Sequence, residues 1–237
     1  MKTVDEENSV LRWGGLAGVL GSIIFLAVFV IVGLFVGADA AEPEGLIIRH
    51  PDISVVRTVE NGLYLLVLVL WVPHFLALYR ALRRTSLAPA YFGSVLGILG
   101  LVLLAAGALV HVATGPISDL YHAASATAAD QATLVLIWQA THGIFDALLV
   151  TGLLLTPIGL IGLGLAMLGA PDFGKRIGGT SVVLGALGVG AAVLLLVDPD
   201  SIPGALVGTL ALIVFHFVLG WKVYRMSRSV GANGASS

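Results

Sequence analysis

Six long apolar runs limit what this chain can fold into more than any other feature of the sequence. A helix needs about 20 predominantly apolar residues to cross the hydrocarbon core of a bilayer. With 58% hydrophobic and 11% charged residues and a mean hydropathy of +1.02, the 237-residue chain has too little polar surface for a water-soluble domain. The sequence therefore predicts an all-α polytopic membrane protein, a bundle of six transmembrane helices. The expected spans are about 14–36, 63–82, 92–112, 145–168, 180–197 and 205–221.

The charges between the runs predict the orientation of the bundle. Lysine and arginine gather at alternate ends of the runs, and an excess of these residues marks cytoplasmic segments. They are Lys2 and Arg12 before the first run, Arg80, Arg83 and Arg84 after the second, Lys175 and Arg176 after the fourth, and Lys222, Arg225 and Arg228 after the sixth. The other ends of the runs are mainly acidic. We therefore expect a plasma-membrane protein with both termini in the cytoplasm.

Residues 1–229 are expected to form one domain, with a disordered tail at 230–237. The two longer outer loops, 37–62 and 113–144, should be partly helical. In the first, Pro43 and Pro51 are expected to break the chain, and Asp52 or Ser54 to cap a short surface helix. In the second, the apolar residues 134–138 suit either a helix lying at the interface or an outward extension of the fourth span.

Ionisable side chains within apolar helices are the candidate functional residues, because burying them in a membrane is costly. An outer group of ligand or proton-binding candidates lies near one depth: Glu60, Tyr64, His111, His142 and Asp146. His142 and Asp146 are four residues apart, which places both on one face of a helix. Three interpretations stay open for this pair: a structural hydrogen bond, a metal site, or the handling of a proton or ligand.

A second, inner pair consists of His74 and His216. Each lies six residues before a basic boundary residue, Arg80 or Lys222, on runs that cross the membrane in the same direction. They should therefore share a depth. Pro73 and Trp71 lie beside His74, and a helix bent by proline could open a small pocket there.

The sequence argues against several activities. No lysine lies in the middle of a span to hold retinal, and no Walker loop, GxSxG elbow or HExxH motif is present. The chain has no cysteine, and its net charge of -2 does not suggest nucleic acid. A role without catalysis is favoured: binding or passage of a small molecule, lipid or proton, or service as a membrane subunit. Besides the lipid bilayer, the expected partners are a second copy of the chain or another membrane protein.

Two alternatives involve cofactors. Histidines paired in two layers, His74 with His216 and His111 with His142, could hold two haem b groups in a membrane redox protein. A divalent metal held by histidine and carboxylate would instead suit a lipid-modifying enzyme, the least favoured class because its ligands are isolated in the sequence.

The segment HGIFDALLVTGLLLTPIGLIGLGLAM, followed by a polar turn with Phe173 and by IGGTSVVLGALGVG, resembles the domain-of-unknown-function 4386 family of small prokaryotic integral membrane proteins. The similarity covers the fourth and fifth spans, and His142 stands where that family has a histidine opening the fourth span. The resemblance implies a similar topology. It implies no activity, since none is established for the family.

Overall fold

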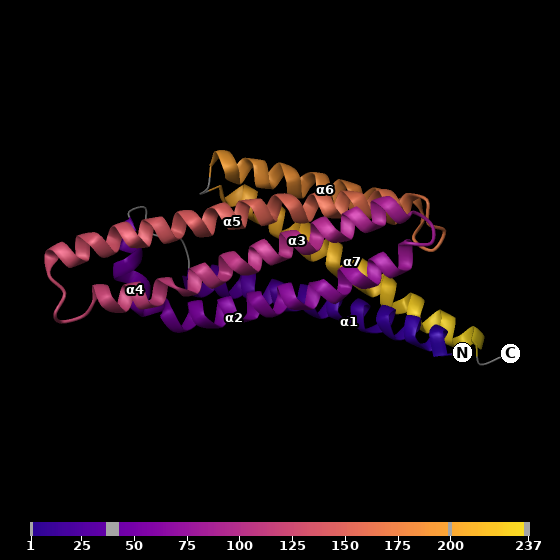
Figure 1. Cartoon of the computed structure of the whole chain (residues 1–237), viewed down its shortest axis with the longest axis horizontal. Helices are drawn as coiled ribbons and strands as arrows, with labels where there is room; N and C mark the ends of the chain where they lie inside the picture. Colours follow the sequence, from indigo (N-terminus) through magenta and orange to yellow (C-terminus); the bar gives the residue numbers. More distant parts are fainter. Residues whose placement is uncertain (1, 37–42, 199–200, 235–237) are drawn as a thin grey trace.

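The computed structural model describes residues 2–36, 43–198 and 201–234, and these residues are helical with short turns and no strand (Figure 1). The elements are α1 (Lys2–Ile31), the π-helical turn η1 (Val32–Val36), α2 (Pro43–Leu82), α3 (Leu87–Val112), α4 (Thr114–Tyr121), α5 (Ala128–Leu168), α6 (Gly174–Val197) and α7 (Ile202–Gly234). Six of these helices are long and apolar enough to cross a membrane. The predicted all-α class is confirmed for the described residues, and the number of helices that could span a membrane agrees with the six expected.

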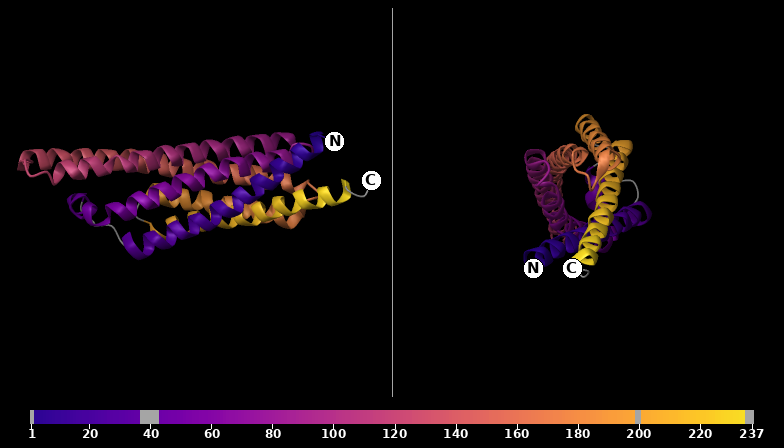
Figure 2. Two further views of the ribbon diagram at one scale, coloured as in Figure 1. Left: turned by 90° about the horizontal axis from the view of Figure 1, so that it is seen from below. Right: turned by 90° about the vertical axis from the view of Figure 1, so that its right-hand side faces the viewer.

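The six long helices form a closed ring. Each packs against the helix before and after it in the order α1, α2, α3, α5, α6 and α7, and α7 packs against α1 to complete the circuit (Figure 2). Both chain ends lie at the same end of the bundle. We call this the terminal end and the other, which carries α4, the distal end.

Glycines let the backbones of two helix pairs approach closely. A Cβ added to Gly159 on α5 would lie 2.5 Å from the amide nitrogen of Gly97 on α3. A Cβ added to Gly220 on α7 would lie 2.8 Å from the carbonyl oxygen of Gly15 on α1. Small residues at such contacts are how membrane helices gain van der Waals packing, because lipid provides little hydrophobic drive between them.

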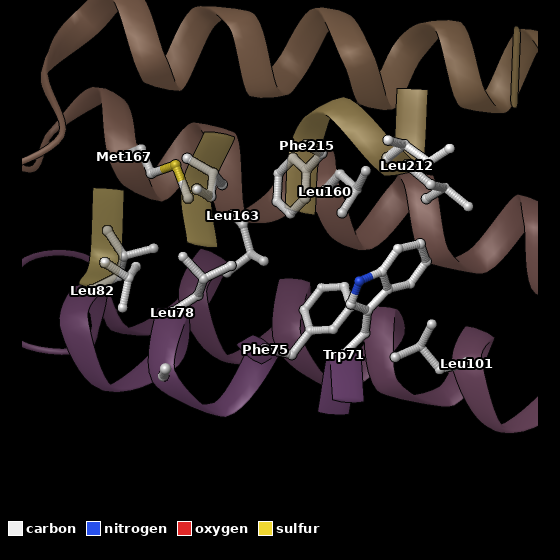
Figure 3. Close-up of a cluster of buried hydrophobic side chains, with 14 of the residues drawn as sticks. Trp71, Phe75, Leu78, Leu82, Leu101, Leu160, Leu163, Met167, Leu212 and Phe215 are labelled. Carbon is white, nitrogen blue, oxygen red and sulfur yellow. The ribbon is translucent and has the colours of Figure 1, made fainter. Parts of the chain in front are cut away.

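The ring is filled by large side chains. Trp71 and Phe75 point from α2 towards Leu160 of α5 and Phe215 of α7, and all four are fully buried or nearly so (Figure 3). This core lies between the distal and terminal ends and surrounds the inner histidine pair.

The predicted break at Pro51 is wrong, because α2 runs through it without interruption. Proline cannot donate to the carbonyl oxygen four residues earlier. That oxygen, on Ile47, instead accepts a hydrogen bond at 3.3 Å from the Ser118 hydroxyl of α4. Ser54 caps no helix there, and its hydroxyl donates to the Pro51 carbonyl oxygen at 3.0 Å.

At the distal end, residues 134–138 belong to α5, which extends well beyond the predicted fourth span. Thr127 and Asp130 form a capping box at its start. From there the helix continues for 41 residues, about 60 Å at 1.5 Å per residue, which is roughly twice the hydrocarbon thickness of a bilayer. Ile47, Tyr121 and Trp138 form a small separate core that joins this extension to α2 and α4.

At the terminal end, α7 continues to Gly234, so part of the expected 230–237 tail is helical. The rest of that tail lies outside the described residues.

Candidate functional site

The inner histidines meet at the centre of the ring. His74 comes from α2 and His216 from α7, both with no exposed surface, and their ring centroids are 5.1 Å apart at an interplanar angle of 63°. The indole of Trp71 stacks on His216, with centroids 3.9 Å apart and planes 10° from parallel. We refer to Trp71, His74 and His216 as the inner cluster. The shared depth expected for the two histidines therefore corresponds to direct contact.

Most polar atoms of the inner cluster have no hydrogen-bond partner. Nδ1 of His74 lies 3.1 Å from the carbonyl oxygen of Gly14 on α1, so this nitrogen is the donor and Nε2 is left as an acceptor. That Nε2, both ring nitrogens of His216 and Nε1 of Trp71 are buried and unpartnered among the described residues. An unpaired buried polar group costs about 1–3 kcal/mol, so such a concentration is unusual in a well-packed core.

Glycines on α1 make the room for this cluster. A Cβ at Gly18 would lie 2.6 Å from Nδ1 of His74, and a Cβ at Gly21 would lie 2.6 Å from Nε1 of Trp71. This face of α1 was not expected from the sequence, although the glycines repeat at helical spacing in GGLAGVLG.

A second group of histidines lies toward the distal end. The rings of His111 on α3 and His142 on α5 have centroids 5.9 Å apart. Nδ1 of His111 is 3.3 Å from Oδ1 of Asn61, and Nδ1 of His142 is 3.2 Å from the carbonyl oxygen of Trp138. Each of these two imidazoles thus has a hydrogen-bond partner, unlike His216.

Two of the other outer candidates have further contacts on their own side of the bundle. Glu60 forms an ion pair with Arg57, with an Nη1–Oε2 distance of 3.0 Å. Tyr64 packs against Phe25, with ring centroids 5.5 Å apart. Asp146 lies on an exposed part of α5. Asn61, which the sequence analysis did not single out, is the residue bonded to His111.

The outer histidines and the inner cluster lie at different levels of the bundle. Along α2, Asn61 and His74 are 13 residues apart, or about 20 Å of helix. Leu68, Leu101 and Leu104 lie in the packed core between these levels.

No protein-family model, curated protein or solved structure matches the chain.

The inner pair does not fit a haem. Two axial imidazoles must lie on opposite faces of a macrocycle, each with a metal–nitrogen bond of about 2 Å. Here the face of His216 is covered by Trp71, and the rings of Phe75 and Phe215 lie 5.2 Å from it. No space for a macrocycle remains between the two imidazoles.

The outer histidines also lack the donor set of a metal site. Within residues 2–36, 43–198 and 201–234, no three histidine or carboxylate side chains are placed to hold one ion together. A structural zinc or calcium site normally needs more ligands than a histidine pair provides.

Proposed function

We propose that this protein is a multi-pass membrane protein that binds one proton reversibly at the inner cluster, without catalysing a reaction. The observation that carries the proposal is His216, which is fully buried in the bundle while both of its ring nitrogens are unpartnered among the described residues. Ionisable residues inside a membrane are costly to keep and usually serve a function.

The geometry of the cluster suits a single proton. The stacked indole of Trp71 favours a cation over its face, so it would stabilise a protonated His216. Two charged imidazoles about 5 Å apart would repel by about 3 kcal/mol at an effective dielectric constant of 20. Binding is therefore expected to stop at one proton per pair.

The stacking also provides a test, because the indole of Trp71 touches the group that would be protonated. We expect the fluorescence of Trp71 to fall as the pH is lowered from about 7 to about 3, since burial disfavours a charged imidazole and an imidazolium in contact with an excited indole quenches it. The measurement uses the full chain in lipid nanodiscs with Trp13, Trp138 and Trp221 replaced by phenylalanine.

The matched controls remove one imidazole at a time. His74→Leu should shift the midpoint of the titration, and His216→Leu should abolish it. A fluorescence that stays flat across this pH range in a folded protein would contradict the proposal, as would an unchanged titration in His216→Leu.

We further propose that both termini face the cytoplasm of a plasma-membrane protein, and that the chain is related to the domain-of-unknown-function 4386 family. The excess of basic residues at the terminal end supports the orientation. We also propose that the protein binds a second copy of itself or another membrane protein.

The orientation can be tested with single cysteines, because the natural chain has none. In intact cells a membrane-impermeant maleimide should label Ala124→Cys, in the turn between α4 and α5, and should leave Thr85→Cys, in the turn between α2 and α3, unlabelled. Thr85→Cys should react after the cells are opened. If only Thr85→Cys were labelled in intact cells, the protein would have the opposite orientation.

A further inference from the structure

A groove between α6 and α7 opens near the terminal end of the bundle. Its volume is about 110 Å³, and its walls are largely apolar, with Ile177 and Leu184 from α6 and Phe215 and Val218 from α7. Arg176, in the first turn of α6, lies at its rim. The groove is apolar, and a cation lies where α6 would enter the membrane. Such an arrangement suits a lipid whose acyl chain lies in the groove and whose charged headgroup lies above it.

Closer to the terminal end, α7 carries exposed aromatic and basic side chains. Trp221, Tyr224, Arg225 and Arg228 line a second, shallow depression. Their spacing of three, four and seven residues places them on one helix face. Trp221 is half-exposed, and its ring lies 5.9 Å from that of Tyr224. Trp and Tyr at this position relative to arginine are typical of the membrane–water interface.

The charges on this surface are not balanced within the protein. Arg176, Arg225 and Arg228 have neither an ion pair nor a hydrogen bond to another described residue. By contrast, Arg57 at the distal end is paired with Glu60. Arg176 lines the apolar groove, and Arg225 and Arg228 line the second depression. The planar guanidinium group of arginine matches the geometry of a phosphate, so these exposed side chains can bind an anion from outside the chain.

We propose that this surface, the groove between α6 and α7 together with the face of α7 from Val218 to Arg228, binds an anionic phospholipid of the adjacent leaflet. Its phosphate lies against Arg225 and Arg228, its glycerol region near Trp221 and Tyr224, and part of one acyl chain in the groove below Arg176. The site is distinct from the inner cluster and does not depend on proton binding there.

Trp221 is a native reporter for this site. The full chain is reconstituted into vesicles of phosphatidylcholine, and bromine-labelled phosphatidylglycerol or bromine-labelled phosphatidylcholine is added. Bromine on an acyl chain quenches a nearby indole, and the part of the signal lost in Trp221→Phe belongs to this tryptophan. We expect half-quenching at about ten-fold less phosphatidylglycerol than phosphatidylcholine, since each basic residue near the membrane surface adds attraction for anionic lipid.

The double variant Arg225→Gln/Arg228→Gln should lose this preference. Arg84→Gln, which removes an exposed arginine from another turn at the same end, should keep it. Equal quenching by the two lipids in the natural chain would overturn the proposal, and so would a preference that survives in the double variant. Relief of quenching by millimolar inorganic phosphate would show a free-anion site instead of a lipid site.

Discussion

Gly159→Ala is expected to destabilise the bundle by about 1–3 kcal/mol, the range for an overpacked core, and to lie near its upper end. The added methyl group would be 2.5 Å from the Gly97 nitrogen and 2.6 Å from the Gly93 oxygen. Both are backbone atoms of α3, so no side chain can rotate away and the two helices must separate. Thermal unfolding in mild detergent, followed by circular dichroism, measures the effect.

Gly143→Ala is the matched control on the same helix. Nothing lies within 4 Å of a Cβ placed there, and the position is exposed. Alanine favours a helix over glycine by about 1 kcal/mol, so this variant should be as stable as the natural chain or slightly more stable. Equal destabilisation by both changes would mean that the approach of α3 and α5 does not depend on glycine.

His216→Leu is expected to raise the free energy of unfolding by about 1–2 kcal/mol while abolishing the proton titration. The change removes two buried nitrogens without partners, each costing about 1–3 kcal/mol, and gives up a stacking contact worth about 0.5–1.5 kcal/mol. Leucine has a similar volume and suits the surrounding Phe75 and Phe215. A gain in stability with a loss of activity is typical of residues kept for function. Chemical unfolding of both proteins in the same detergent gives the comparison.

His111→Leu provides the opposite case. Its Nδ1 is bonded to Asn61, so removing the imidazole leaves a buried amide oxygen without that partner, and stability should fall. If His216→Leu were destabilised to the same extent, His216 would be a structural residue and the proposed proton site would lose its support.

The helices and their depth could be predicted because bilayer thickness and hydropathy fix them locally. Counting residues from Arg80 and Lys222 was enough to predict that His74 and His216 share a level. The continuity of α2 could not be predicted in this way. The Ile47 carbonyl oxygen that Pro51 leaves without a backbone donor is satisfied by the Ser118 hydroxyl, which lies far along the chain.

The site was only partly predictable for the same reason. Sequence spacing shows which residues share a face of one helix, and it does not show which helices are neighbours. The contact of His74 with Gly14, and the stacking of Trp71 on His216, both depend on α1 and α7 packing together beside α2. Glu60 was grouped with the outer histidines by depth, whereas an arginine one turn away on its own helix pairs with it.

The contact between α1 and α7 has a consequence for biogenesis. During synthesis on the ribosome, α1 is made first of the six long helices, and α7, which packs against Gly15 of α1, is made last. Until then, the glycine face of α1 has only α2 as a neighbour, and the ring stays open to lipid. The ring of helices can therefore close only after α7 has been made and packs against α1.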